Sequence, residues 1–189
     1  MPVRCQPLIR PARPQDLPAV HEINRCGWDG VCVAQALERR HGLVGGAGWR
    51  ERKAHEVEGW CKAHLDRVLV AEVEGAVVGY ATWAYDASDR IGEVGNNAVH
   101  PDWRSRGIAT ALISEAIRRL LAEGAQVLRV TALEQAAPAQ RVYAKLGFRE
   151  LGRSIMYTMS AEQAAAALAQ VASGSPGADA PRQTGAGGQ

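Results

Sequence analysis

Residues 99–110 read VHPDWRSRGIAT, and they join the end of a β-strand, a turn and the start of a helix. An apolar run ends at Val99, the turn contains Arg104 and Arg106, and Gly107 precedes an amphipathic pattern. The first turn of a helix has unpaired backbone N–H groups and carries the positive end of the helix dipole. Because two guanidinium groups and a residue without Cβ accompany them, the stretch predicts a phosphate or pyrophosphate site. An ordinary strand-to-helix turn with solvated arginines is the alternative.

The composition is that of one globular domain with balanced charge. The chain has 189 residues, of which 47% are hydrophobic, and its 22 basic and 20 acidic residues give a net charge of +2. This length suits a single domain, and the charge balance gives no reason to expect nucleic acid. The first residues lack the apolar run of a signal peptide, and no stretch approaches the length of a membrane span. We therefore expect a soluble cytoplasmic protein that binds neither nucleic acid nor a membrane.

The cysteines indicate free thiols rather than disulfides or a metal site. All four, Cys5, Cys26, Cys32 and Cys61, lie in the first third of the chain and form no CxxC pair. This usage favours a reducing compartment. Cys26, Cys32 and His64 do not have the spacing of zinc ligands, so we expect no metal site.

The hydrophobic patterns predict elements in the order β-α-α-β-β-β-α-β-α-β-β, a mixed α/β sandwich built on one sheet. Strands are expected at residues 8–10, 68–73, 76–83, 91–99, 127–133, 148–151 and 154–159, the last two as a closing hairpin. Helices are expected from Pro14 onward, at residues 49–66, from residue 108 to a stop at Gly124, and at residues 137–146. Glycines interrupt a short helical pattern within residues 27–48, which indicates a loop. Gly95 and the pair Asn96-Asn97 break the alternation of their strand and predict a bulge.

The composition changes beyond residue 160. Residues 161–172 are alanine-rich, which allows a transient helix, and residues 173–189 combine Gly, Ser, Pro and Ala without a large apolar residue. Such a segment buries too little apolar surface to offset its chain entropy. We therefore place one domain at residues 1–160 and a disordered Ala/Gly/Pro-rich tail at residues 161–189.

Three segments within residues 7–160 resemble a known family. The first is Ile9-Arg10-Pro11-Ala12 followed by Asp16. The second, Arg104-Ser105-Arg106-Gly107-Ile108-Ala109, has the pattern Gln/Arg-x-x-Gly-x-Gly/Ala. The third, Tyr143-Ala144-Lys145-Leu146-Gly147-Phe148, has the pattern Tyr-x-x-x-Gly-Phe. In this order the three resemble the GNAT superfamily of N-acetyltransferases. The resemblance implies a mixed, mostly antiparallel sheet with helices on both faces.

The resemblance also implies acetyl-CoA as co-substrate, attacked directly by an amine in a ternary complex. The pyrophosphate would lie on the turn, chiefly through its backbone N–H groups, and the pantetheine arm would pair with the preceding strand. A backbone N–H near Val99 would stabilise the oxyanion. The residues that would bind the cofactor are Ala98, Val99, Arg104, Ser105, Arg106, Gly107, Ile108, Ala109 and Thr110. The family often has an asparagine at the position of Ala136, so one polar contact to the cofactor arm is in doubt, and the neighbouring Gln135 is the substitute.

Two residues are candidates for proton transfer. Tyr143 matches the family tyrosine that lies near the cofactor sulfur, and a phenol with a pKa near 10 is protonated at neutral pH. The alternative is a buried tyrosine that packs its helix against the sheet. Glu93 lies where some family members have a catalytic glutamate, and it is the candidate base. The alternatives are that Glu93 is a polar residue on an exposed strand face, or that Asn97 orients the substrate or a water.

The acceptor is expected to be a primary amine of a small molecule. Trp28, Trp49 and Tyr85 lie near predicted loops where the family builds its acceptor pocket, and Asn97 is the fourth candidate contact. Two alternatives stay open: a protein N-terminal or lysine acetyltransferase, and a non-catalytic acyl-CoA-binding sensor. The sequence is also compatible with a homodimer.

Overall fold

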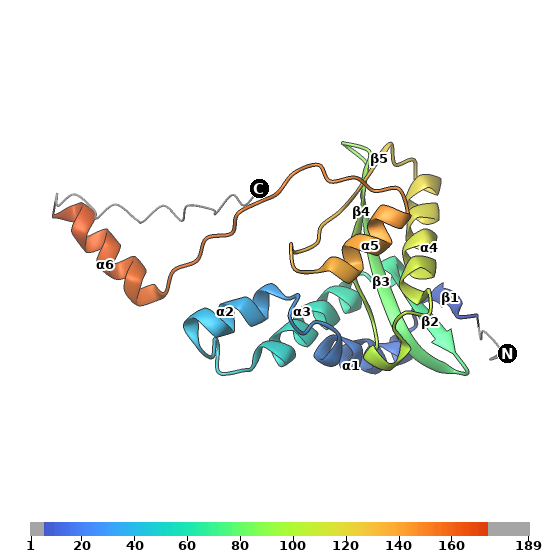
Figure 1. Cartoon of the computed structure of the whole chain (residues 1–189), viewed down its shortest axis with the longest axis horizontal. Helices are drawn as coiled ribbons and strands as arrows, with labels where there is room; N and C mark the ends of the chain where they lie inside the picture. Colours follow the sequence, from blue (N-terminus) through green and yellow to red (C-terminus); the bar gives the residue numbers. More distant parts are fainter. Residues whose placement is uncertain (1–5, 174–189) are drawn as a thin grey trace, which may run out of the picture. The chain divides into compact units, whose positions relative to one another are not determined.

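The structure of the protein is a computed structural model that describes residues 6–173 (Figure 1). The chain divides into two compact units, Met1–Leu151 and Gly152–Gln189, which are described in turn. Within residues 6–173, every helix is too short or too polar to cross a lipid bilayer.

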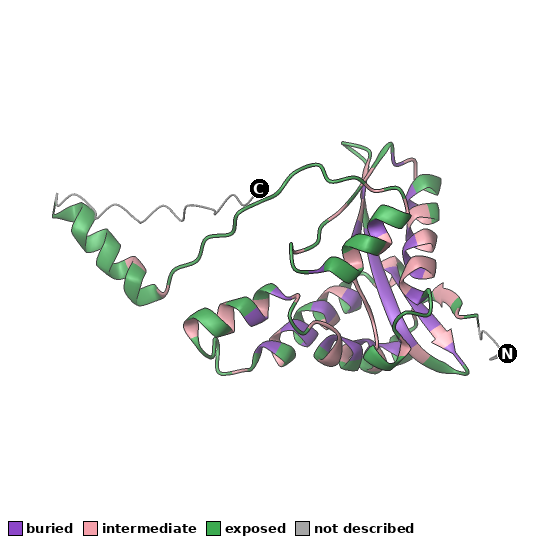
Figure 2. Ribbon diagram, in the orientation of Figure 1, coloured by how far each residue is buried: buried purple, intermediate pink, exposed green. Residues whose placement is uncertain are grey.

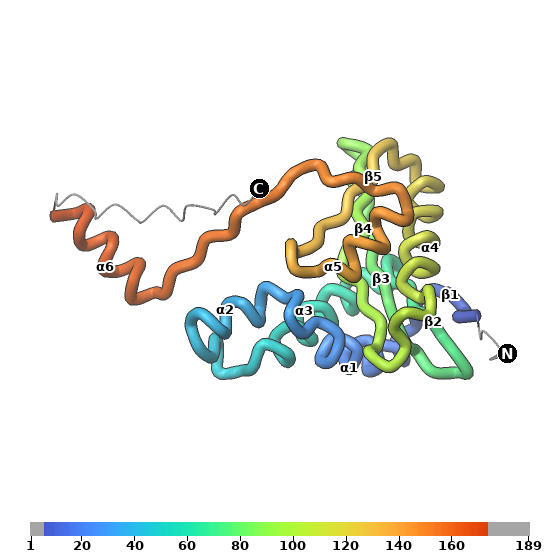
Figure 3. The backbone as a smooth tube through the Cα atoms, in the orientation of Figure 1, coloured from blue at the N-terminus to red at the C-terminus, as the bar shows by residue number. Residues whose placement is uncertain are grey.

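The first unit is built on one five-stranded sheet, and Figure 3 shows the backbone path through it. Its strands are β1 (Leu8–Pro11), β2 (Val68–Val73), β3 (Ala76–Asp86), β4 (Ile91–Val99) and β5 (Val127–Val130). They lie in chain order, with antiparallel pairing from β1 to β4 and parallel pairing between β4 and β5. The predicted mixed, mostly antiparallel sheet is confirmed.

Helices cover both faces of this sheet. The helices of the first unit are α1 (Leu17–Gly27), α2 (Val33–His41), α3 (Trp49–Ala63), α4 (Ile108–Ala122) and α5 (Ala137–Lys145). The apolar stripe of α4 packs with Tyr143 of α5 against Leu69, Ala81 and Trp83 on one face. On the other face, α1 and α3 enclose Val68, Val70 and Tyr80. The buried colour in Figure 2 follows β2 and β3, so the core lies along the centre of the sheet.

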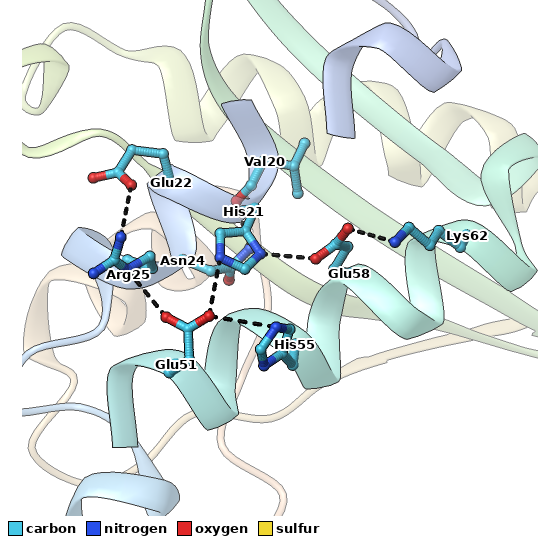
Figure 4. A network of polar contacts seen from close by, with 9 residues as sticks. All are labelled: Val20, His21, Glu22, Asn24, Arg25, Glu51, His55, Glu58 and Lys62. Atoms are coloured by element: carbon cyan, nitrogen blue, oxygen red, sulfur yellow. Dashed lines mark hydrogen bonds and ion pairs between the residues drawn. The ribbon is translucent and has the colours of Figure 1, made fainter. Parts of the chain in front are cut away.

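A polar network joins the outer sides of α1 and α3 (Figure 4). His21 Nδ1 lies 2.8 Å from Glu58 Oε2, and His21 Nε2 lies 3.6 Å from Glu51 Oε1. Glu51 also contacts His55 on the next turn of α3, at 3.3 Å. Lys62 and then His21 lower the pKa of Glu58 through hydrogen bonds. The seam between the two helices is therefore bridged by partly solvated charges above an apolar interior.

A buried ion pair closes the start of the fold. The Arg10 guanidinium donates to both oxygens of Asp16, at 2.7 and 2.9 Å, and its Nε donates to Glu72 on β2 at 2.7 Å. The Arg13 backbone N–H also donates to Asp16, at 2.7 Å. These bonds, led by the one from Arg10, lower the pKa of the Asp16 carboxyl, which is only 5% exposed. The carboxylate thus joins β1 to the turn that begins α1.

Asp16→Asn is expected to lower the free energy of unfolding at pH 7 by about 2–4 kcal/mol, since Arg10 loses its charge partner. The folded-state pKa of Asp16 lies below its usual value of 3.8, so this stability is present above that pH. It is lost as the pH falls through the folded-state pKa, and the difference between the two proteins should shrink there. Urea denaturation at pH 7 and at pH 2 measures both. Asp66→Asn is the matched control, because Asp66 is exposed and its substitution should change the free energy of unfolding by under about 0.5 kcal/mol. A deficit equal at both pH values would contradict the ion-pair account.

The predicted closing hairpin is wrong, because the structure assigns no strand to residues 148–151 or 154–159. Apolar alternation describes the two faces of a strand but does not supply a hydrogen-bonding partner. Two other predictions need smaller corrections. The loop expected at residues 27–48 contains the nine-residue helix α2, and β5 ends at Val130 rather than at residue 133.

The described part of the second unit contains helix α6 (Ala161–Ala172). Ser160 caps its N-terminus by accepting from the Gln163 N–H, and the Gln163 side chain accepts from the Ser160 N–H. This reciprocal capping favours the alanine-rich helix that the sequence allows. The tail predicted as disordered, residues 161–189, thus contains α6, and its residues 174–189 lie outside the described residues.

Candidate active site

Strands β4 and β5 part halfway along β4. Their parallel register runs from Ile91 opposite Val127 to Val94 opposite Val130, where β5 ends. In the described part of the chain, no strand pairs with β4 beyond Val94 on that side. The edge formed by residues 95–99 therefore offers backbone groups to an extended, amide-rich ligand.

A bulge in β4 lies at the point where the strands part. The pairing with β3 shifts between Ala81 and Trp83, which sets Gly95 and Asn96 against Thr82 and confirms the predicted bulge. A Cβ on Gly95 would lie 2.6 Å from Thr82 Oγ1, so only glycine fits this backbone path. Thr82 Oγ1 donates to the Asn96 carbonyl oxygen at 3.1 Å. The bulge is thus held by a side chain of the neighbouring strand.

Tyr143 on α5 meets the bulged strand through Asn97. The Asn97 amide Nδ2 donates to the Tyr143 hydroxyl oxygen at 3.2 Å and to the Gly95 carbonyl oxygen at 3.0 Å. Tyr143 is 8% exposed, and burial raises its pKa, while the bond from Asn97 lowers it. The phenol is therefore protonated at neutral pH. Because its oxygen accepts from Asn97, its own proton is free for donation to a ligand at the β4 edge.

The turn before α4 has the backbone shape of an anion site. Gly107 is the N-cap residue of α4 with φ of 82°, and Ser105 also has a positive φ, of 62°. A Cβ built on Gly107 meets nothing within 4 Å, so the space in front of its backbone is open. Behind it, Ile108, Ala109 and Thr110 form the first helical turn, whose N–H groups lack intrahelical acceptors. The backbone alone supplies the donors that a pyrophosphate needs.

The two arginine side chains of the turn bond to the protein itself. Arg104 Nη2 donates to the Gly27 carbonyl oxygen at 2.6 Å and its Nε to the Val99 carbonyl oxygen at 3.3 Å. Arg106 Nη2 donates to the Asp102 carbonyl oxygen at 3.1 Å, and its guanidinium lies 4.6 Å from the Trp103 ring centroid. Arg104 thus ties the end of α1 to the end of β4.

Glu93 lines a pocket between α3 and the centre of the sheet, named here the α3–β4 pocket. Its volume is about 290 Å³, and its lining residues are Trp60, Thr82, Trp83, Ala84, Glu93, Gly95 and Asn96. Glu93 pairs with Ala84 across the strands and forms an ion pair with Arg129 at 2.6 Å. Glu93 lies on the same strand as Asn97, the hydrogen-bond partner of Tyr143. The two proton-transfer candidates, Glu93 and Tyr143, are therefore both associated with β4.

The other sequence-predicted acceptor residues separate in space. The Trp28 indole donates to Asn24 at 2.7 Å, and the Lys53 ammonium lies 4.8 Å from the Trp28 ring centroid. Trp49 is buried at the start of α3 and lines neither pocket described here. Tyr85 lines a different pocket, of about 300 Å³, which shares Glu93 with the α3–β4 pocket.

Sequence reasoning missed the side of α3 that faces this region. Lys53, Glu56 and Trp60 follow at steps of three and four residues, which places them on one face of a helix. Lys53 bonds to Asn96, and Trp60 lines the α3–β4 pocket. The helical spacing was readable, but nothing in the sequence shows that this face turns toward the bulge of β4.

Among the described residues, the cysteine side chains line neither of the two pockets. Cys26, Cys32 and Cys61 are free thiols, and burial raises the pKa of Cys61 to about 11. Cys5 lies outside the described residues. Among residues 6–173, no group of three or more His, Cys, Asp and Glu side chains is placed to hold a metal ion.

A strand that parts from its neighbour, a buried phenol beside its free edge and a glycine-capped helix together form a site whose chemistry suits an extended, phosphate-bearing ligand. The profile of the Acetyltransferase (GNAT) family matches residues 19–148, more than half of the chain. The chain therefore belongs to this family.

Relatives with known names agree with the family. An acetyltransferase from Yersinia enterocolitica is 40% identical over 80 residues, which are 42% of this chain and 55% of that protein. The chain thus spans about half the length of this curated relative. The ribosomal-protein-alanine N-acetyltransferase from Brucella melitensis has 26% identity and a TM-score of 0.56, over 77% of this chain and 86% of that chain. The PaiA N-acetyltransferase from Thermoplasma acidophilum, solved with coenzyme A, has 17% identity and a TM-score of 0.62, over 78% and 92%, and shows the shared fold.

Proposed function

We propose that the protein transfers an acetyl group from acetyl-CoA to a primary amine by direct attack in a ternary complex. The observation that carries the proposal is the buried Tyr143 hydroxyl, which lies beside the free edge of β4 in a chain whose helix α4 begins at an open, glycine-capped turn. Family membership supports the same chemistry. The N–H groups around Gly107 would hold the pyrophosphate, and the edge of residues 95–99 would pair with the pantetheine amides.

The reaction needs a proton removed, an oxyanion stabilised and a thiolate protonated. Glu93 accepts the proton of the attacking ammonium, directly or through water, from the side of the α3–β4 pocket. A backbone N–H near Val99 donates to the oxyanion of the tetrahedral intermediate. When the carbon–sulfur bond breaks, Tyr143 donates its proton to the departing thiolate. The groups proposed for these steps belong to β4 and α5.

The acceptor we propose is a small molecule. The α3–β4 pocket, at about 290 Å³, has the size of a site for a small metabolite. Trp60 supplies an aromatic wall and Glu93 a carboxylate, which together suit a compact ammonium. None of the four acceptor residues predicted from sequence lines this pocket: Trp28, Trp49, Tyr85 and Asn97 are all absent from its walls.

A protein amine is the second candidate acceptor, because the Brucella neighbour is named as an N-acetyltransferase for ribosomal-protein alanine. A thiol-release assay with acetyl-CoA decides between them, using a panel of amino acids, amino sugars and polyamines beside peptides with free N-termini. Mass spectrometry of the products identifies the acetylated atom. Tight acetyl-CoA binding without thiol release on any amine would instead favour the non-catalytic sensor.

We also propose a cytoplasmic location and a homodimer. The free thiols of Cys26, Cys32 and Cys61 support a reducing compartment. Sedimentation at several protein concentrations tests the homodimer, since a monomer at all of them would exclude it.

Glu93→Gln is expected to lower kcat/KM about 100-fold at pH 6.5, where the acceptor amine is protonated and needs a base. Above pH 9 the amine loses its proton to solvent, so the deficit should shrink. Glu74→Gln, in the exposed β2–β3 turn, is the control with the same chemical change and an expected wild-type rate. A deficit that stays constant across the pH range would rule out Glu93 as the base.

A further inference from the structure

Lys53 places a charged group in the interior beside the bulge of β4. The residue is 9% exposed, and its ammonium donates to Asn96 Oδ1 and to Glu56 Oε1, each at 2.9 Å. The ammonium also lies 4.8 Å from the Trp28 ring centroid. Burying a charge is costly, and an apolar side chain such as methionine would fill this space without that cost. The geometry of the ammonium therefore calls for an explanation beyond packing.

The Trp28 ring that the ammonium contacts belongs to a partly buried hydrogen-bond network between α1 and β3. The Tyr80 hydroxyl of β3 donates to Asn24 Oδ1 on α1 at 2.6 Å, and the Trp28 indole donates to the same oxygen at 2.7 Å. Asn24 is fully buried, and its amide donates to the Val20 carbonyl oxygen at 2.7 Å. Trp28 is thereby fixed in orientation, and its ring face receives the ammonium. Lys53 thus connects the Trp28 ring to Asn96 on β4.

The residue that Lys53 holds is next in the chain to the one that contacts the phenol. Asn96 bonds to Lys53, whereas Asn97 bonds to the Tyr143 hydroxyl. The backbone between them belongs to the bulge, where the Asn96 carbonyl oxygen accepts from Thr82. A change in the Asn96 side chain can therefore alter the direction of the Asn97 amide, since a bulge lacks the regular ladder that would resist it.

We propose that Lys53 is a positioning residue for the acetyl transfer: through Asn96 it holds the bulge of β4, so that Asn97 orients the Tyr143 hydroxyl. The inference rests on the proposed function, because it assigns Lys53 a role only if Tyr143 acts on the thiolate. It gives α3 a second role, beside the aromatic wall that Trp60 supplies to the α3–β4 pocket. In this role Lys53 fixes the position of Asn96 and Asn97 before the reaction begins, and it does not contact acetyl-CoA.

The test compares the full-length wild-type protein with five variants. Lys53→Met keeps the aliphatic stem and removes the donor, and kcat is expected to fall about tenfold while KM for acetyl-CoA stays within about twofold. Lys53→Arg keeps a donor and should recover most of the rate. Asn96→Ala removes the acceptor and should match Lys53→Met, and the double variant should be no slower than the slower single variant. Lys62→Met on the same helix, whose ammonium pairs with Glu58, is the control.

A pH profile separates positioning from general destabilisation. The bond from Asn97 lowers the pKa of Tyr143, so a misplaced amide lets that pKa rise. A general acid is active when protonated, and its rate falls as the pH rises through its pKa. The alkaline limb of kcat should therefore move to higher pH in Lys53→Met and Asn96→Ala, but not in Lys62→Met. Tyr143→Phe should abolish the limb, and a limb that persists there would refute the proposed acid whatever Lys53 does.

Two results would overturn the proposal. One is a Lys53→Met protein that is folded by circular dichroism and has the wild-type kcat. The other is a fall in kcat with an unmoved alkaline limb and additive losses in the double variant, which would make Lys53 a structural residue only.

Discussion

Gly107→Val is expected to weaken coenzyme A binding at least about 100-fold, a loss of about 2.7 kcal/mol. Two physical effects combine. The φ of 82° is a conformation that a β-branched residue adopts only with strain, so the turn would shift and redirect its N–H groups. The new side chain would also enter the open space in front of Gly107, where the pyrophosphate would approach the backbone. Isothermal titration with coenzyme A measures the loss directly.

Gly75→Val is the matched control for this experiment. Gly75 lies in the β2–β3 turn with φ of 81°, and a Cβ there also meets nothing within 4 Å. The backbone strain is therefore alike, while no ligand is expected at that turn. Gly75→Val should lower the melting temperature but leave coenzyme A affinity within about twofold. Unchanged affinity in a folded Gly107→Val protein would remove the turn from the cofactor site.

The fold was predictable where local sequence and tertiary packing agree. Residues 91–99 form β4 within the predicted bounds, and the periodic apolar positions after Gly107 form α4. Gly95 broke the strand alternation, and the structure shows why: its missing Cβ lets Thr82 approach. In each case the side chains near one another in sequence carry the information, because their spacing decides which face is buried.

The sequence was not sufficient where an interaction needs a partner from a distant part of the chain. Residues 148–159 have strand-like alternation but no assigned strand, since a strand is completed by a neighbour that the pattern does not name. Arg104 carries the positive charge that suits an anion, and its bond to the carbonyl oxygen of Gly27, 77 positions away, could not be read from the sequence. Charge alone does not show which acceptor a guanidinium reaches.

The contacts within the candidate site could be predicted only in part, for the same reason. Asn97 and Tyr143 were both named from the sequence, but their contact joins residues 46 positions apart and needs α5 to cross the end of β4. Lys53 gave no signal, because a lysine among the charges of α3 looks like a solvated residue until the fold buries it. Glu93 was named from the sequence as the candidate base. Its ion pair with Arg129 could not be predicted, because it follows from the parallel pairing of β4 and β5.

Tyr143→Phe is expected to lower kcat by about 10²–10⁴-fold, the cost of losing a general acid. The ring keeps its packing against Phe148, whose centroid lies 6.1 Å away, so the protein should stay folded. Asn97 loses one acceptor but keeps the Gly95 carbonyl oxygen, which limits the loss of stability to about 1 kcal/mol. Coenzyme A affinity should change by less than about twofold, because the hydroxyl acts on the thiolate as it leaves. Single-turnover rates of thiol release measure the chemical step.

The pH dependence of the rate should distinguish Tyr143→Phe from Glu93→Gln. Raising the pH supplies free amine and so restores the glutamine variant, but it supplies no proton to a thiolate and cannot restore Tyr143→Phe. Tyr157→Phe removes an exposed hydroxyl from the second unit and should turn over like the wild type. If Tyr143→Phe also did so at every pH, the buried phenol would be a packing residue that braces α5 against Asn97, and the thiolate would leave without a protein acid.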